Sequence, residues 1–450
     1  MSKPNTTALR IGEKARRLPN ALNGLEPTLA YQISQQRLLP ADRQSDRLKV
    51  DIPSYVFPRR FEPLHMLLCG GTGSGKTQFI KMLLNQIVPR GDKGLAVDHG
   101  SELMSGYFRP GDINFNLLDK RFPGWCPFNE ISDFWDFDTL ARMVIPDGAS
   151  SQEREWHRYA QSCLSSIMGR CHQFGMTTNA ELLEMLTVAP RERLAELLTG
   201  DPTAQFFSKE NEKMGGSIRA IITQYTRPWK FMNAGTFSIR EWVLDDSNRS
   251  WLWIGYRDST YPFLRSFISM ATSIAVTFAM DLSEDRERRF FFITDELATL
   301  DPLAMLSEAL AKIRKRGGCV LSGVQTLSQL REKYGHDGAQ TLLSNFSTKI
   351  ALRTFDVAIA KEFSEYFGEF EHYVETISEG QSSGKGTSMN SGSSFQLKTS
   401  RVVTPGELIQ MPERQGIIQM PGLPAGEINI PIVETPVGFG TEPFISRKGN

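Results

Sequence analysis

The 450-residue sequence has few cysteines, few histidines and no excess charge of either sign. Its five cysteines are scattered without a Cys-x-x-Cys pair, which argues against a disulfide framework and predicts reduced, mostly buried thiols in a cytosolic protein. The six histidines are equally dispersed, so they offer no ligand set for a dedicated zinc site.

The balance of charge and the absence of long apolar runs exclude two further classes. Lysine plus arginine and aspartate plus glutamate both total 51, which excludes a generally basic nucleic-acid coat but not a local basic channel. The best candidate for a membrane segment, 267–280, carries four hydroxyl side chains and is shorter than the about 20 residues that a span needs. We expect a buried core helix there, and the polar N-terminus is not a signal peptide.

The most informative motif is a complete phosphate-binding loop that directly follows the apolar run 66–69. A strand that ends in glycines and continues as a helix directs backbone N–H groups and the helix N-terminus at one point, where phosphate binds. The lysine of such a loop reaches the β- and γ-phosphates, and the next hydroxyl binds Mg²⁺. The sequence therefore predicts a site for ATP and Mg²⁺ formed by Gly70, Gly71, Thr72, Gly73, Ser74, Gly75, Lys76 and Thr77.

Two carboxylates follow a second apolar run, 289–294. Open α/β sheets bind ligands at the carboxyl ends of their strands, so we expect Asp295 and Glu296 at the same edge as the phosphate loop. We predict that Asp295 holds Mg²⁺ together with Thr77, and that Glu296 polarises the water that attacks the γ-phosphate. An isolated strand with two acidic residues after it is usually a solvated turn, but the phosphate loop upstream favours the catalytic interpretation.

Three more polar residues are candidates for the same reaction. Gln325 ends the apolar run 319–324 and is predicted to sense the γ-phosphate, with a strand-end cap as the alternative. Arg314 lies in the basic run 312–316 and is a candidate arginine finger for the next subunit. The alternative for Arg314 is a solvated helix end, where cations favour the macrodipole. Arg257 is a second candidate for the finger.

Strand-like runs alternate with helical patterns, which predicts an α/β fold with a mostly parallel sheet. Helical spacing of apolar residues and few β-branched runs predict an all-α insertion. Thr77 and Asp295 are 218 positions apart (295 − 77), far more than a minimal P-loop core needs, and the insertion occupies the excess. That separation argues against small kinases and small GTPases. The predicted domains are a polar N-terminal arm (1–50), a nucleotide-binding domain (51–135 and 229–435) and the all-α insertion (136–228).

The C-terminal part of the sequence contains a Ser/Gly tract at 379–395 that cannot bury a core. We expect a flexible surface loop there, with a DNA-touching pore loop as the alternative. Beyond the tract, 405–440 is rich in proline and glycine, and its apolar run 416–420 suits a closing edge strand. Within the arm, a short helix is expected at 29–38.

Together these motifs resemble the type IV secretion coupling proteins, the TrwB/TraD-like conjugative DNA pumps of the RecA-like FtsK/HerA superfamily. The Trp-x-x-Phe-Asn-Glu-Ile box before the helical insertion is more specific than the Walker motifs, which many ATPases share. The resemblance extends from about 60 to 432 and includes the phosphate loop and the segments 97–103, 124–131, 237–242, 294–300 and 323–330.

The resemblance implies a RecA-like ring hexamer whose channel passes single-stranded DNA from a relaxase toward a membrane secretion channel. The family's trans arginine falls on Arg314, and the all-α domain is expected to face the cytoplasm, where the DNA-processing complex docks. Most members start with two transmembrane helices, which this sequence lacks. We therefore expect a cytoplasmic protein that a separate membrane-anchoring partner holds at the inner membrane, and a monomer when it is isolated.

The leading hypothesis is a DNA-dependent ATPase that recruits the relaxase–DNA complex and pumps single-stranded DNA during conjugation. Such a motor grips DNA through its phosphates, so binding is tolerant of sequence and weakens steeply with salt. One alternative is a nucleotide-gated docking platform for secretion substrates. A third hypothesis keeps the fold but predicts a HerA-like double-stranded DNA translocase.

Overall fold

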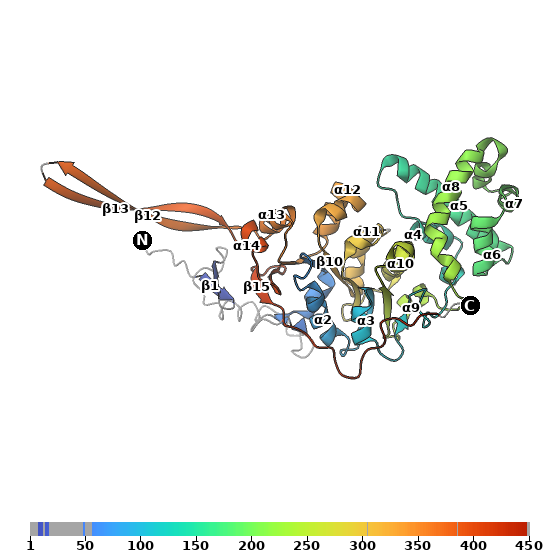
Figure 1. Ribbon diagram of the computed structural model, residues 1–450, viewed down its shortest axis with the longest axis horizontal. Coiled ribbons are helices and arrows are strands. Elements are labelled where there is room, and N and C mark those ends of the chain that lie inside the picture. The colour runs from blue at the N-terminus through green and yellow to red at the C-terminus, as the bar shows by residue number, and fades with distance from the viewer. Residues whose placement is uncertain are drawn as a thin grey trace.

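The computed structural model describes residues 8–11, 14–17, 48–49, 56–303, 305–384 and 386–447. A sheet flanked by helices forms its central body, a helical domain lies at one end, and a long two-stranded hairpin projects from the other (Figure 1). The α/β fold with an all-α insertion that the sequence predicts is therefore confirmed.

In the described part of the chain the central sheet has nine strands in the order β15-β14-β11-β5-β10-β9-β6-β8-β7. From β7 to β11 every neighbouring pair is parallel, whereas β14 and β15 are added antiparallel to β11. The strands are β5 (Met66–Cys69), β6 (Lys93–His99), β7 (Ile113–Asn114), β8 (Trp251–Tyr256), β9 (Phe290–Thr294), β10 (Gly318–Val324), β11 (Thr348–Leu352), β14 (Gln415–Gln419) and β15 (Gly426–Asn429).

The central strands are continuously apolar because both faces of the sheet are covered. In β5, Met66 and Leu68 belong to one apolar core, whereas Leu67 and Cys69 belong to the core on the opposite face. Parallel strands buried in this way lose the polar alternation of a half-exposed strand. The flanking helices are α2 (Lys76–Ile87), α3 (Glu102–Tyr107), α9 (Ile239–Leu244), α10 (Tyr261–Phe278), α11 (Leu306–Ile313), α12 (Leu327–Ser344), α13 (Val357–Tyr366) and α14 (Pro405–Ile409).

The helical insertion contains no strand between Asp136 and Phe231. A capping box at Ser150 and Glu153 starts its longest helix, because each residue bonds the backbone N–H of the other. The exact domain boundaries remain a prediction. The main helices of the insertion are α4 (Asp136–Val144), α5 (Ser151–Gln173), α6 (Asn179–Leu183), α7 (Arg191–Leu197) and α8 (Glu212–Thr226).

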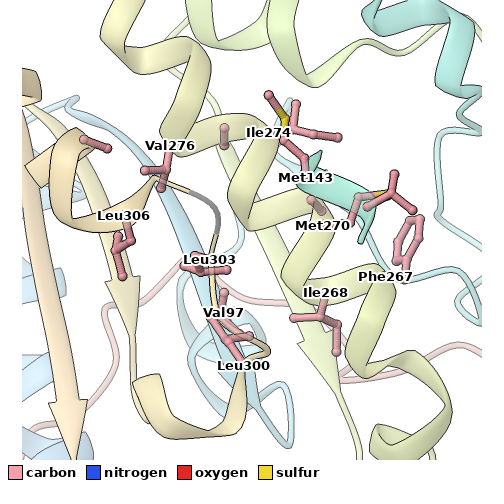
Figure 2. Packing of buried hydrophobic residues seen from close by; sticks show 14 of the residues in the cluster. Val97, Met143, Phe267, Ile268, Met270, Ile274, Val276, Leu300, Leu303 and Leu306 are labelled. Atoms are coloured by element: carbon pink, nitrogen blue, oxygen red, sulfur yellow. The ribbon is translucent and has the colours of Figure 1, made fainter. Parts of the chain in front are cut away.

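Helix α10 joins the insertion to the sheet. Figure 2 shows Met143 of α4 on one side of α10, and Leu300 and Leu303 on the other. Among the described residues this is the one helix whose length and composition would suit a membrane span, but 78% of its most apolar window is buried within the fold. The predicted core helix is therefore confirmed.

The Trp-x-x-Phe-Asn-Glu-Ile box joins the two chain segments that enter and leave the insertion. Glu130 is buried and accepts hydrogen bonds from the indole of Trp125 (2.6 Å) and from the first N–H groups of α9, those of Ile239 and Arg240 (both 2.8 Å). Asn129 donates to the carbonyls of Gly235 and Phe237, both at 2.9 Å. The carboxylate thus caps a helix more than one hundred residues away, which gives this box a structural role.

The structure differs from the sequence prediction at the Ser/Gly tract. Where we predict a flexible surface loop, residues 379–384 and 386–395 belong to a hairpin of β12 (Glu369–Gly384) and β13 (Gly386–Arg401). A backbone ladder needs no apolar alternation, so a Ser/Gly tract can form one. The alternative, a DNA-touching pore loop, remains a prediction.

The two ends of the chain complete the architecture. Run 416–420 forms β14 as predicted, but β15 and not β14 is the outermost strand. Much of the predicted arm, including the expected helix at 29–38, lies outside the described residues; the described part has the antiparallel pairs β1–β2 (Ala8–Ile11 and Lys14–Arg17) and β3–β4 (Leu48–Lys49 and Val56–Phe57). The C-terminal tail runs beneath α2 and α3 toward α9 (Figure 1).

Candidate nucleotide site

The phosphate loop connects β5 to α2, and three of its glycines are required by its backbone conformation or close packing. Gly73 and Gly75 have φ angles of 71° and 109°, in the region that favours glycine. A Cβ atom on Gly70 would lie 2.5 Å from the Ser74 hydroxyl. The loop therefore curls tightly enough for the buried Lys76 ammonium to donate to the carbonyls of Gly70 (2.7 Å) and Gly71 (3.3 Å).

The structure brings the predicted carboxylates and the predicted sensor to this loop. The Thr77 hydroxyl donates to Asp295 Oδ2 at 3.3 Å, across the gap between α2 and the end of β9. The Thr72 hydroxyl lies 3.4 Å from Gln325 Oε1, and the Gln325 N–H donates to Glu296 Oε1 at 3.4 Å. The phosphate loop, the two predicted carboxylates and the predicted sensor, which one subunit supplies, thus lie at one edge of the sheet.

The oxygen atoms at this edge fit Mg²⁺. Asp295 Oδ1 and Glu296 Oε2 are buried and have no hydrogen-bond partner among the described residues. Mg²⁺ prefers oxygen ligands and is usually held by one or two protein oxygens together with substrate phosphates and water. Asp295 and Thr77 would hold the ion, which would neutralise charge that develops on the phosphates.

Burial shifts the proton affinities of the same groups. It raises the pKa of Glu296 to about 7 and raises the pKa of Asp295, although the Lys76 ammonium opposes both shifts. Burial lowers the pKa of Lys76, whose charge Glu296 and Asp295 stabilise. A carboxylate with a pKa near 7 can accept a proton from a water molecule that its second oxygen orients.

The raised pKa of Glu296 predicts how stability changes with pH. In the unfolded chain this group loses its proton near its ordinary pKa of 4.5, but in the folded protein only near 7, so its ionisation destabilises the fold across that interval. We expect the Glu296→Gln variant to gain Tm relative to the parent protein as the pH rises from 5 to 7, with a constant difference above that. Thermal unfolding at several pH values measures this, with Glu332→Gln on α12 as the control for loss of an exposed carboxylate. An equal difference at all pH values would contradict the prediction.

Gly323 lets β10 pass close to the catalytic end of β9. A Cβ atom there would lie 1.8 Å from the backbone carbonyl oxygen of Asp295. We expect Gly323→Ala to displace that backbone, to destabilise the fold by about 1–3 kcal/mol as overpacking does, and to lower ATP turnover. Denaturant unfolding measures the first effect. Gly338→Ala in α12 is the control, because its Cβ atom would meet only the Tyr334 Cβ at 3.5 Å, an ordinary contact.

Arg314 lies at the opposite edge of the sheet from the phosphate loop. Its short helix η11 (Arg314–Arg316) precedes β10, whereas the phosphate loop follows β5, and the two strands are parallel and in register. Seven residues of β10 span roughly 20 Å. Arg314 therefore cannot reach Lys76 of its own subunit, which agrees with a role in a neighbouring one.

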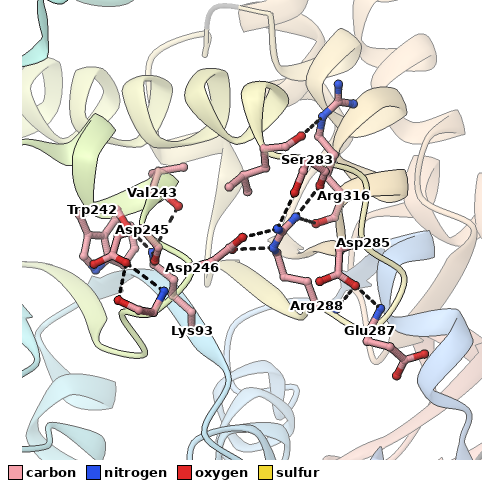
Figure 3. Close-up of polar contacts among 12 residues, drawn as sticks. Lys93, Trp242, Val243, Asp245, Asp246, Ser283, Asp285, Glu287, Arg288 and Arg316 are labelled. Carbon is pink, nitrogen blue, oxygen red and sulfur yellow. Dashed lines mark hydrogen bonds and ion pairs between the residues drawn. The ribbon is translucent and has the colours of Figure 1, made fainter.

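The surroundings of Arg314 are held by backbone contacts that leave its side chain exposed. Arg288 donates to the carbonyl of Arg316 (3.1 Å) and pairs with Asp246 (2.5 Å), and Arg316 donates to the carbonyl of Leu282 (2.6 Å) (Figure 3). Within the described part of the chain, the Arg314 guanidinium makes no hydrogen bond or ion pair. The structure thus fixes the turn that carries Arg314 and leaves its guanidinium available.

Arg257 has a partner within its own chain. It follows β8 at the same sheet edge as Lys76, and its guanidinium lies over the ring of Phe444 in the C-terminal tail, 3.9 Å from the ring centre. Its role as a finger remains a prediction. Because the Arg314 guanidinium is unengaged, Arg314 is the better placed of the two candidates.

Sequence reasoning missed residues that contact the phosphate loop, among them Arg353, whose carbonyl accepts from the Gly71 N–H at 2.9 Å, and Arg414. The Arg414 N–H donates to the carbonyl of Ser74 at 3.0 Å, and the Arg414 Cγ would lie 3.1 Å from a Cβ on Gly75. Arg414 adopts a φ of 59°, which is rare for a residue with a side chain. No sequence signal marks this contact, because the strained conformation arises only when the segment before β14 meets the loop.

A phosphate loop, a strand-end Asp-Glu pair and a neighbouring glutamine at one edge of a parallel sheet define a P-loop ATPase of the RecA-like class. The family model for the type IV secretion-system coupling protein DNA-binding domain matches residues 49–431. The chain belongs to this family.

Individual relatives agree with this assignment. The coupling protein TraD of Escherichia coli K12 is 28% identical over 431 residues, which cover 92% of this chain and 57% of TraD. The plasmid coupling protein TrwB in complex with the ATP analogue ADPNP has a TM-score of 0.82 at 28% identity and covers 94% of this chain and 96% of its own. TrwB with ADP and Mg²⁺ has the same score and identity and covers 97% and 100%. The chain thus spans little more than half the length of TraD.

Proposed function

We propose that the protein is a DNA-dependent ATPase that couples ATP hydrolysis to the transport of single-stranded DNA into a type IV secretion channel. The observation that carries this proposal is the convergence of the phosphate loop, Asp295, Glu296 and Gln325 at one edge of the sheet. The nucleotide and the metal in the TrwB structures support ATP and Mg²⁺ as cofactors.

The division of the ATP site between two edges of the sheet supports a head-to-tail assembly. One subunit supplies Lys76, Asp295 and Glu296, and the next subunit supplies Arg314. Repetition of such a heterologous contact closes into a ring, and a hexamer encloses a channel for DNA. In this proposal the isolated protein is a monomer, and assembly on DNA activates hydrolysis.

The remaining partners follow from the same function. A relaxase bound to the transferred strand would be recruited through the helical insertion, and components of the secretion channel would receive the DNA. A separate membrane-anchoring protein would hold the motor at the cytoplasmic face of the inner membrane. The family assignment supports association with a type IV secretion system.

The proposal is tested by ATP turnover with and without a single-stranded oligonucleotide over a range of protein concentrations. We expect stimulation by the single strand, a steeper than linear dependence on protein concentration, and weaker stimulation by a duplex of equal length. Equal stimulation by the duplex would favour a double-stranded DNA translocase. No stimulation at any concentration would contradict a DNA motor and favour a docking platform gated by nucleotide.

A further inference from the structure

Helices α8 and α10 lie where the helical domain meets the central body (Figure 1). A basic pocket is lined by side chains of α8 and of the first turns of α10. Its volume is about 690 Å³, within the range of about 300–1,000 Å³ that is typical of ligand sites. Three arginines line it, Arg219, Arg227 and Arg265, together with the carboxylate of Asp301. The balance of charge in the pocket is therefore positive.

The wall formed by α8 is suited to a closely approaching polymer backbone. Gly216, Arg219, Ala220 and Thr223 of α8, and Arg227 directly after its end, recur at helical spacing and line the pocket, whereas the opposite side of α8 packs into the core through Ile218 and Ile222. Between the two arginines the lining residues are the small Ala220 and Thr223 and the larger Gln224 and Tyr225. A chain of phosphates could approach the helix beside Ala220 and Thr223, between the guanidinium groups.

Contacts within the protein hold Arg219 and Arg265 in place, but each retains a buried nitrogen without a hydrogen-bond partner among the described residues. Arg219 is fixed because its Nε donates to the carbonyl of Leu186 at 3.1 Å, while its Nη2 is buried without a partner among the described residues. Arg265 pairs with Asp301 at 2.5 Å, and its Nε is likewise buried and unpartnered. Such nitrogen atoms favour an anion with several acceptor oxygens.

An aromatic ring lies beside these charges. Phe263 lines the pocket from α10, and the Arg227 guanidinium lies over its ring, 5.8 Å from the ring centre. Proteins that bind single strands without sequence preference combine a basic groove with aromatic rings on which bases stack. A duplex could not offer an unpaired base to this ring, and a protein ligand would not require both features.

From these observations we infer that the pocket holds a segment of single-stranded nucleic acid, with phosphates on Arg219 and Arg227 and a base on Phe263. This inference rests on the proposed function and names the site at which the motor would contact its substrate. The pocket also adjoins the catalytic strand, because Asp301 follows Glu296 by five residues and its N–H donates to Ser269 of α10 at 2.8 Å. A phosphate that competes with Asp301 for Arg265 would alter the contacts of the segment that follows Glu296.

The inference is tested by the binding of a fluorescent oligothymidylate to the full chain at several salt concentrations. Each lost phosphate contact should reduce the slope of log K against log salt by about 0.7, so Arg219→Ala combined with Arg227→Ala should reduce it by about 1.4. Phe263→Ala should weaken binding about tenfold with little change of slope. Arg158→Ala, which removes an exposed arginine of α5 outside the pocket, should leave both quantities unchanged.

Unchanged basal ATP turnover and Tm in the variants would show that the fold is intact. If the parent protein binds the oligonucleotide and all pocket variants bind it equally well, the inference is overturned and the proposed function is not. If the parent protein does not bind single strands at all, both fail. Loss of self-association with unchanged DNA binding would instead show that the pocket is a contact between copies of the chain, and would overturn the inference.

Discussion

Replacement of Arg314 by alanine is expected to reduce ATP turnover by about 10³- to 10⁵-fold while ATP still binds, as loss of an arginine finger does. The reason is the position of Arg314 before β10, remote from its own phosphate loop, with a guanidinium that makes no hydrogen bond or ion pair within the described part of its chain. ATP affinity, measured by titration of a fluorescent analogue, should change little, because the phosphate loop of each subunit is intact.

Two controls make this result specific. Lys315→Ala removes a neighbouring exposed cation from the same turn and should retain activity. A mixture of Arg314→Ala subunits with Lys76→Ala subunits should recover part of the activity. The intact phosphate loop of the first can then be completed by the intact Arg314 of the second. Full turnover by Arg314→Ala, or by the parent protein as strictly isolated subunits, would disprove the shared site.

Replacement of Lys76 by alanine is expected to abolish measurable turnover and, in contrast to Arg314→Ala, to weaken ATP binding. Lys76 is the buried cation of the cradle, and nearby Asp295 and Glu296 carry the opposite charge. Without it, the phosphates would meet two carboxylates without compensation from the loop, and loss of one donor at such a centre alone costs about 10²- to 10³-fold in rate.

The matched control for this variant is Lys81→Ala on the same helix. Lys81 pairs with Glu102 of α3 and lies outside the loop, so its loss should leave ATP binding and turnover close to those of the parent protein. Turnover by Lys76→Ala within tenfold of that of the parent protein would mean that ATP is not hydrolysed at this phosphate loop.

Those parts of the fold that the sequence predicted are the ones encoded locally. Strand β5 has the bounds of the apolar run 66–69 because strands buried on both faces are continuous apolar runs. The phosphate loop and the Asp-Glu pair are recognisable for a similar reason, since each is a short motif with chemistry of its own. Their meeting at one edge follows from the parallel order of β5, β10 and β9.

The features that the sequence did not reveal depend on contacts between distant segments. The partner of Arg257 is Phe444 in the tail, and Arg414 reaches the phosphate loop only because the segment before β14 folds back onto it. The hairpin of β12 and β13 is held by its backbone ladder, which leaves no pattern in the Ser/Gly composition of 379–395. The basic pocket combines side chains of α8, of α10 and of the segment at Asp301, so the sequence of any one segment does not reveal it.

The contacts that Glu130 and Asn129 make with the start of α9 and the segment before it have an evolutionary consequence. They hold the chain segments that enter and leave the helical domain side by side. The rest of the fold therefore closes over this junction in the same way, whatever the length of chain between the two segments. With such a junction, a different helical domain could replace this one without disturbing the central sheet. A change confined to the helical domain would therefore leave the contacts at the edge of the central sheet in place.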